Sequence, residues 1–297
     1  MSASPPDPFE SFCALILTNR RSEHVHTYST LRRNGYTGPI VLVVDDEDPS
    51  VEDYRARFGD DAVQVFDKRA IAARFDEGDN FEDRRSIFYA RNASFDIAEA
   101  LGYRYFIQLD DDYTGFGFRF RADGTYGTGV VHNLDGLLRA VLAFFIATPA
   151  LSSVALAQGG DFIGGGANRT TAASICTLRK AMNSFVCDTR RRFEFLGRVN
   201  EDVNTYSASQ RSGRALFLTL NAASITQLTT QANAGGLTEM YRDSGTYVKS
   251  FYSVLYAPSA VQIAMMGNIN RRLHHHVRWD AVAPLILSER HRRASAP

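Results

Sequence analysis

The first 112 residues alternate between two hydrophobic periods. Short, nearly continuous apolar runs that end in polar residues predict strands, and stretches with apolar positions three or four residues apart predict helices between them. The predicted strands cover residues 13–20, 38–48, 62–67 and 103–112, and the predicted helices cover residues 22–34, 49–58 and 84–102. Nearly continuous apolar strands that alternate with helices are typical of a mainly parallel sheet with helices on both faces, so we expect an α/β fold.

The pattern after residue 112 is less regular. Glycine-punctuated residues 118–129 predict a hairpin, residues 134–148 predict an apolar helix, and residues 151–166 predict a strand that enters a glycine-rich turn. Residues 235–258 are rich in Tyr, Gly and Ser and predict a flexible loop that leads into a strand. No repeat, low-complexity block or linker divides the chain. We therefore expect residues 1–297 to form a single domain in which the second half completes the same sheet.

The composition is that of an ordinary globular protein. With 297 residues and 44% hydrophobic residues, the chain can bury a full core. No run approaches the roughly 18 apolar residues of a membrane helix, and the N-terminus lacks the basic start and apolar middle of a signal peptide, so we expect a cytoplasmic location. The three cysteines, Cys13, Cys176 and Cys187, have no metal-ligand spacing and are expected to be structural.

The charge is balanced overall but uneven along the chain. A formal net charge of zero argues against a protein that coats nucleic acid without selectivity. The basic residues are 30 Arg and 3 Lys, a bias that suits phosphate binding, although a G+C-rich gene gives the same bias. Six arginines gather after residue 270, and an anionic partner could contact this tail: Arg271, Arg272, Arg278, Arg290, Arg292 and Arg293.

Three consecutive aspartates end the predicted strand 103–112. If strand geometry continues, Asp110 and Asp112 point to one side and Asp111 points to the other. Two carboxylates on one side repel each other unless a cation lies between them. Carboxylate oxygens suit hard divalent ions such as Mg or Mn, so the cluster predicts a metal site at Asp110 and Asp112. The alternative is a solvated acidic turn.

A second acidic pair, Glu201 and Asp202, precedes a predicted helix over residues 202–213. An acid at this position is often an N-cap that is favoured by the helix dipole, and this alternative stays open. The functional alternative is a general base, for which Asp202 is the stronger candidate. A base must reach the attacking oxygen on the face opposite the leaving group.

A run of three histidines lies near the C-terminal end. His274 and His276 alternate around His275, and either imidazole could complete the coordination of a metal that Asp112 holds. A surface strand or a phosphate-contacting strand would fit the same residues.

Together these motifs resemble the GT-A fold glycosyltransferases, in which a nucleotide-binding α/β half ends in a D-x-D that holds a metal on the sugar-nucleotide diphosphate. The resemblance covers residues 13–205 and includes "TNR", "DDED", the helical "ARN", "QLDDDY", "GGDFIGGG" and "NEDVNTY". The acid-rich context looks most like the TET/JBP-associated glycosyltransferases, which are thought to act on hydroxymethylated bases in phage DNA. In that case the location is the host cytoplasm.

The resemblance implies a role for individual residues. Residues 11–115 would form the nucleotide-sugar-binding half and residues 116–297 the acceptor-binding half. Mg or Mn would bind Asp110 and Asp112, and the donor, most plausibly a UDP-sugar, would lie against the ends of the first strands. The donor-contacting side chains would be Thr18, Asn19, Arg20, Asp45 or Asp46, Arg91, which faces the diphosphate, and Asp111. Inverting members place a base in an "ED", which assigns that role to Asp202 or Glu201.

These observations predict a metal-dependent, inverting glycosyltransferase whose acceptor is a hydroxyl group, and the subgroup resemblance implies a hydroxymethylated pyrimidine in double-stranded DNA. Aromatic residues of the segment 240–256 would stack on a sugar or an extruded base. Three alternatives stay open: a saccharide or protein acceptor, a metal-dependent nucleotidyltransferase that releases pyrophosphate, and a nucleotide- or DNA-binding module without turnover.

Overall fold

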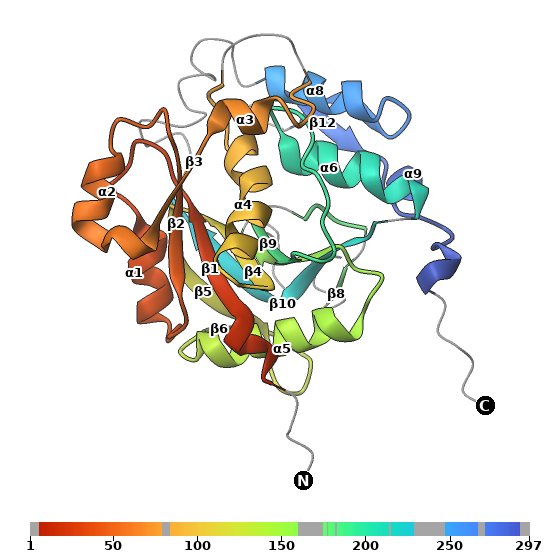
Figure 1. Cartoon of the computed structure of the whole chain (residues 1–297). Helices are drawn as coiled ribbons and strands as arrows, with labels where there is room; N and C mark the ends of the chain where they lie inside the picture. The colour runs from red at the N-terminus through yellow and green to blue at the C-terminus, as the bar shows by residue number, and fades with distance from the viewer. Residues whose placement is uncertain are drawn as a thin grey trace.

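A single mixed sheet organises the described part of the chain (Figure 1). The computed structural model describes residues 6–78, 84–159, 175–176, 178–181, 183–213, 215–228, 247–266 and 271–291. The sheet has 10 strands in the order β3-β2-β1-β4-β9-β7-β10-β5-β6, and β8 pairs with β10. The expected α/β class, with helices on both faces of a mainly parallel sheet, is confirmed.

The first half follows the predicted alternation of strands and helices. Its strands β1 to β4 are parallel, and β1 lies between β2 and β4. The short helix α3 was missed because five residues show no helical period. The elements are η1 (Pro8–Ser11), β1 (Phe12–Leu17), α1 (His26–Arg33), β2 (Ile40–Asp45), α2 (Val51–Phe58), η2 (Asp60–Ala62), β3 (Val63–Phe66), α3 (Lys68–Ala72), α4 (Phe88–Ala100) and β4 (Tyr105–Asp110).

The second half completes the sheet with strands of both directions. The predicted hairpin and apolar helix are present, and β9 inserts between β4 and β7, antiparallel to both. The glycine-rich residues 160–166 lie outside the described residues. The elements are β5 (Tyr113–Phe120), β6 (Tyr126–Val130), α5 (Leu134–Ala147), β7 (Ser153–Gln158), β8 (Ile175–Cys176), β9 (Ser184–Asp188), α6 (Glu201–Ser209), η6 (Gln210–Ser212) and β10 (Phe217–Gln227).

The C-terminal residues form a small unit against α6. It contains α8 (Val248–Tyr256), the antiparallel pair β11 (Val261–Met266) and β12 (Arg272–Val277), α9 (Trp279–Val282) and η8 (Glu289–His291). The prediction of a loop leading into a strand is wrong for residues 248–256, which are helical; residues 235–246 lie outside the described residues. Aromatic and β-branched residues suggested a strand, but apolar positions 248, 251, 252, 254 and 255 carry a helical spacing.

Two hydrophobic clusters, one on each face of the sheet, explain why the first strands are apolar throughout. In β1, Ala14 and Ile16 enter one cluster with residues of α1, α2 and α5, whereas Cys13 and Leu15 enter the other with residues of α4 and α6. All six residues of β1 are buried, so its period of two is not visible as an alternation of apolar and polar residues. Cys13 and Cys187 are buried free thiols, which agrees with the expectation that these cysteines have a structural role.

The described helices are all too short or too polar to cross a lipid bilayer.

Arg191 ties α5 to the inserted strand β9. Its guanidinium donates to the carbonyl oxygens of Phe145, Thr148 and Leu151 at 3.3, 3.3 and 3.0 Å, and it pairs with the buried Asp188 at 3.3 Å. The guanidinium carbon also lies 3.8 Å from the Phe145 ring centroid. One side chain therefore satisfies several carbonyl groups around the end of α5.

We expect Arg191→Ala to lower the free energy of unfolding by about 2 kcal/mol, because it removes these hydrogen bonds and leaves carbonyl groups without a partner. Urea denaturation measures the change. Arg190→Ala, at the exposed neighbouring position, is the matched control and should change the free energy by less than about 0.5 kcal/mol. Equal effects of the two variants would contradict the role of Arg191.

Candidate functional site

The carboxyl ends of β1, β2 and β4 form the edge at which most predicted site residues meet. Leu17, the last residue of β1, is in register with Asp110, the last residue of β4, and Val43 of β2 accepts a hydrogen bond from the amide of Thr18. Polar residues that follow parallel strands are thereby placed side by side, at the edge where open α/β sheets bind ligands.

Asp111 belongs to a buried hydrogen-bonded group at this edge. Its carboxylate accepts a hydrogen bond from the Thr18 hydroxyl at 2.8 Å and pairs with Arg21 at 2.9 Å. The Tyr54 hydroxyl of α2 lies 3.0 Å from that of Thr18 and accepts from the amide of Arg21 at 2.8 Å. Burial raises the pKa of Asp111, and Arg21 opposes that rise. Asp111 therefore fixes the loop after β1.

Asp45 organises a neighbouring group at the end of β2. It accepts a hydrogen bond from the Asn19 amide at 2.8 Å and pairs with the buried Lys68 at 3.2 Å. Burial raises the pKa of Asp45, and Lys68 opposes that rise. Asp46 is exposed, and its side chain accepts from the backbone amide of Lys68 at 2.9 Å, so the two acids hold the start of α3.

Arg20 differs from its neighbours because its side chain is exposed. Its backbone adopts a left-handed conformation with φ of 54°, and its amide donates to Asp48 at 2.6 Å. Such a conformation is uncommon for a residue other than glycine, and here the hydrogen bond to Asp48 fixes it. Asp48 thus shapes the loop from which Arg20 projects.

Arg91 joins the two acidic motifs. From α4 its Nε donates to Glu201 at 2.7 Å, and its Nη2 donates to Asp110 at 3.0 Å. The guanidinium is 1% exposed and packs against the rings of Phe185 and Phe195. The expectation that Arg91 faces the donor diphosphate stays a prediction, but its observed contacts are ionic links between two parts of the protein.

Asp110 and Asp112 are strongly perturbed acids. Burial, with Asp112 and Glu201 nearby, raises the pKa of Asp110 to about 8, although Arg91 opposes the rise. Burial and Asp111 raise the pKa of Asp112 to about 6. The Oδ1 atom of Asp112 is buried and has no hydrogen-bond partner among the described residues. An unpaired buried carboxylate oxygen is costly unless a ligand or an ion completes it.

Asp202 lies in the first turn of α6, with Glu201 before it. Its carboxylate is buried and accepts a hydrogen bond from the amide of Val203 at 2.7 Å. Burial and the charge of Glu201 raise the pKa of Asp202 to about 6. Asn200 occupies the N-cap position, so the acids are inside the helix rather than ahead of it.

These residues fit a divalent cation. The donor set is hard carboxylate oxygen, and the pKa of each acid is raised by burial and by like charges. The buried Asp112 Oδ1 also lacks a partner within the described ranges. No group of three or more His, Cys, Asp or Glu side chains within the described ranges forms a complete metal site by itself. Mg²⁺ and Mn²⁺ sites that take remaining ligands from phosphate and water require no such group.

The histidine run forms strand β12 beside β11. His275 contacts the residue that precedes the acidic pair: its Nδ1 lies 3.3 Å from the Asn200 amide nitrogen. His276 is exposed and His274 is half-buried. Metal binding by His274 or His276 stays a prediction.

Sequence reasoning missed several residues of this edge. Arg21, Tyr54 and Lys68 hold the acids, and Asn200 and His275 join α6 to the C-terminal unit. Arg21 follows the predicted "TNR" directly, and Lys68 is one of three lysines in the chain, so position and rarity were available signals. The remaining partners come from distant segments, and no local pattern identifies them.

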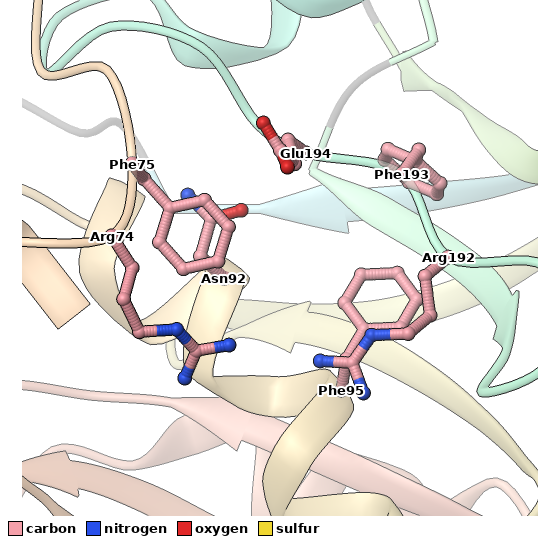
Figure 2. A pocket seen from close by; sticks show the side chains of 7 residues that line it. All are labelled: Arg74, Phe75, Asn92, Phe95, Arg192, Phe193 and Glu194. Carbon is pink, nitrogen blue, oxygen red and sulfur yellow. The ribbon is translucent and has the colours of Figure 1, made fainter.

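A separate pocket of about 280 Å³ lies beside α4 (Figure 2). Its lining residues are Arg74, Phe75, Asn92, Phe95, Arg192, Phe193 and Glu194. Arg74 and Arg192 both pair with Asp96, and both Asn92 side-chain groups are bonded to the backbone of Phe195. None of its lining residues belongs to the candidate site, and Arg74, Asn92 and Arg192 already have protein partners.

Comparison with known proteins gives one family. The model of a family described as TET-Associated Glycosyltransferase matches residues 12–236. No curated protein matches the chain.

Among solved structures, the chain is similar to TarS 1–349 from S. aureus in complex with UDP, with 12% identity and a TM-score of 0.41. The match covers 82% of this chain and 64% of that one. It is similar to the mannosyltransferase PcManGT from Pyrobaculum calidifontis in complex with GDP-Man and Mn2+, with 12% identity, a TM-score of 0.44 and coverage of 86% and 75%. For glucosyl-3-phosphoglycerate synthase from Mycobacterium tuberculosis the identity is 9%, the TM-score 0.41 and the coverage 90% and 86%. The chain thus spans less than two thirds of the TarS fragment.

The perturbed acids predict how stability depends on pH. The ordinary pKa of an Asp is near 3.8, and in the folded protein it rises to about 8 for Asp110 and about 6 for Asp112 and Asp202. Each raised pKa means that the folded state binds the proton more tightly. This contribution to stability is complete below pH 3.8 and is lost as the pH rises through 6 and then 8.

We therefore expect Asp112→Asn to raise the melting temperature in chelator at pH 8, because the variant removes one of the two repelling carboxylates. We also expect Mn²⁺ to raise the melting temperature of the variant less than it raises that of the parent protein. Scanning calorimetry from pH 4 to 8.5, with chelator or Mn²⁺, measures both effects. Asp61→Asn, at an exposed position, is the control. A destabilised Asp112→Asn that keeps the full Mn²⁺ effect would refute the metal assignment.

Proposed function

Because the chain belongs to the TET-associated glycosyltransferase family, we propose that it transfers a glycosyl group from a nucleotide-sugar donor to a hydroxyl group of an acceptor. The observation that carries this proposal is the set of carboxylates at the carboxyl edge of the sheet. Asp110, Asp112 and Asp202 all have raised pKa values, and Arg91 joins the donor-side acid Asp110 to the first turn of α6. Perturbed acids gathered at a ligand-binding edge are typical of active sites.

The donor would lie across the ends of β1, β2 and β4. Asn19 and the pair Asp45–Lys68 offer hydrogen-bonding groups at the end of β2, where they would contact the base or ribose. Asp111 and Thr18 would support this surface from below through their mutual hydrogen bond. The exposed Arg20 side chain is free to lie along the nucleotide phosphates.

A divalent cation, Mn²⁺ or Mg²⁺, would be held by Asp110 and Asp112. When bound, it supplies positive charge to the leaving nucleoside diphosphate. The chain itself favours this arrangement, since ionised Asp110 and Asp112 repel each other and Asp112 Oδ1 has no partner in the part of the chain that the structure describes. We propose Mn²⁺ or Mg²⁺ as the ion and a UDP-sugar as the donor.

Asp202 would act as the general base. The acceptor oxygen would form a bond to the anomeric carbon while the bond from that carbon to the diphosphate oxygen breaks. Asp202 would take the proton of the acceptor hydroxyl, and the electron pair of the broken bond would leave with the diphosphate. A pKa raised to about 6 makes the carboxylate a stronger base than an ordinary aspartate and leaves it ionised at neutral pH. Glu201 is paired with Arg91, which favours Asp202 as the base. Direct attack by an acceptor hydroxyl that Asp202 deprotonates gives an inverting outcome.

For the acceptor we propose a hydroxymethylated pyrimidine in double-stranded DNA of a phage. The family description and the exposed arginines near the C-terminal end support it: Arg271 and Arg278 are exposed on either side of β12. Arg292 and Arg293 lie outside the described residues. The base would have to leave the duplex, because a donor bound at a sheet edge cannot reach a hydroxymethyl group inside the stack.

Asp202→Asn should keep donor binding and lose transfer by about 100-fold or more, because the acceptor hydroxyl loses its base. Donor affinity by calorimetry and transfer rate by mass spectrometry measure the two effects, and the parent profile should fall as the pH drops below about 6. If Asp202 had only a structural role, the variant would keep the parent turnover, and its stability at pH 8 would not fall, because a raised pKa means that the ionised carboxylate is unfavourable in the folded protein. Release of nucleoside diphosphate, and not pyrophosphate, separates this reaction from nucleotidyl transfer.

The DNA acceptor is tested by incubating the protein, Mn²⁺ and a panel of sugar nucleotides with hydroxymethylated DNA. Mass spectrometry of the digested nucleosides should show a gain of one sugar. Replacing Arg271 and Arg278 together by Ala should weaken DNA binding. It should also lower the number of counterions released on binding, measured from the salt dependence of the affinity, by about two. Modification of a saccharide or protein, with no donor modifying DNA, would reject this acceptor and retain the glycosyltransferase.

A further inference from the structure

The first turn of α6 is held from two sides. On the inner side Glu201 pairs with Arg91 of α4 at 2.7 Å. On the outer side Asn200, the residue before it, donates to the Ser253 hydroxyl of α8 at 2.6 Å and lies 3.3 Å from His275 Nδ1 of β12. Asp202, which follows Glu201, therefore lies in a turn that is linked to α4, α8 and β12. α6 and α8 lie side by side in Figure 1.

Asn200 makes these contacts in an unusual conformation. Its φ of 61° and ψ of 37° are left-handed, and its side chain makes no capping hydrogen bond to its own helix. An asparagine at an N-cap ordinarily accepts a hydrogen bond from an amide two or three residues later. Here the side chain points away from the helix, toward Ser253 and His275. The local benefit of a cap is replaced by a link to the C-terminal unit.

The partners of Asn200 are suited to a fixed link. Ser253 is fully buried, and its position is set by the face of α8 that packs against α6. Burial, followed by His274, Lys249 and Lys180 nearby, lowers the pKa of His275 to about 3, so the ring is neutral at working pH. A neutral imidazole that is protonated at Nε2 accepts a hydrogen bond at Nδ1.

We propose that Asn200 is a positioning residue, through which α8 and β12 hold the Asp202 carboxylate in register with the acceptor hydroxyl. This inference rests on the proposed function of Asp202. General-base catalysis needs the base within hydrogen-bonding reach of the proton, and an error of about 1 Å can cost roughly 100-fold in rate. The contacts of Asn200 are with α8 and β12 and include none of the donor-side residues at the ends of β1 and β2, so we expect the link to affect transfer more than donor binding.

The test uses Asn200→Gly, because glycine keeps the left-handed backbone at no steric cost and removes only the side chain. We expect kcat for transfer to fall about tenfold or more, with the KM for the donor unchanged. Ser253→Ala and His275→Ala should each lower kcat in the same way. His275→Asn should recover part of the loss, since its amide oxygen can accept where Nδ1 did. Gln262→Ala, on the exposed side of β11, is the matched control.

A double-mutant cycle separates a shared link from general loosening. If Asn200 and His275 act through one contact, the double variant Asn200→Gly, His275→Ala should be no slower than the slower single variant. An Asn200→Gly protein with the parent kcat overturns the positioning role, as does a loss of donor affinity equal to the loss of kcat. Absence of transfer by the parent protein with every donor and acceptor would instead reject the proposed function.

Discussion

The site depends on the ion pairs of one buried arginine. Arg91 is nearly inaccessible to water, yet it carries a full charge, and Asp110 and Glu201 on either side of it make that charge tolerable. Removing either acid would leave the buried guanidinium with a single carboxylate partner, and breaking a buried ion pair costs much more than losing a surface ion pair. The Phe185 and Phe195 rings that enclose the guanidinium restrict its movement. The distance between the donor-side acid and α6 is thereby fixed by α4.

Much of the α/β half follows from its sequence, because its signals are local. A strand buried on both faces, such as β1, is a continuous apolar run, and the helix α1 has a clear amphipathic period. The placement of Thr18, Asn19, Asp45 and Asp110 at one edge also follows, since parallel strands bring their carboxyl ends together. The strand β4 ends at Asp110, and residues 111 and 112 form a turn; Asp110 meets Arg91 and Asp111 meets Arg21.

The remainder of the site could not be read from the sequence because its contacts are long-range. Whether Arg91 faces a ligand or joins two acids depends on where residue 201 lies, 110 positions away. The histidine run has an evident alternation, but its register against β11 and the position of α6 decide which ring contacts Asn200. The helix α8 is different, because its apolar positions do carry a local helical spacing, which the Tyr-, Gly- and Ser-rich composition of residues 235–258 obscured.

The insertion of β9 between β4 and β7 has a consequence for how the molecule assembles. The parallel strands β1 to β4 come from the first 110 residues, but β4 gains its other neighbour only from residues 184–188, and β5 pairs with residues beyond 217. Such non-local pairings require closure of long loops before any contact compensates for the lost chain entropy, which makes folding slow. The charged groups of the site, which span both halves, can meet only after this closure. Until then the buried acids remain in water and do not oppose collapse of the sheet.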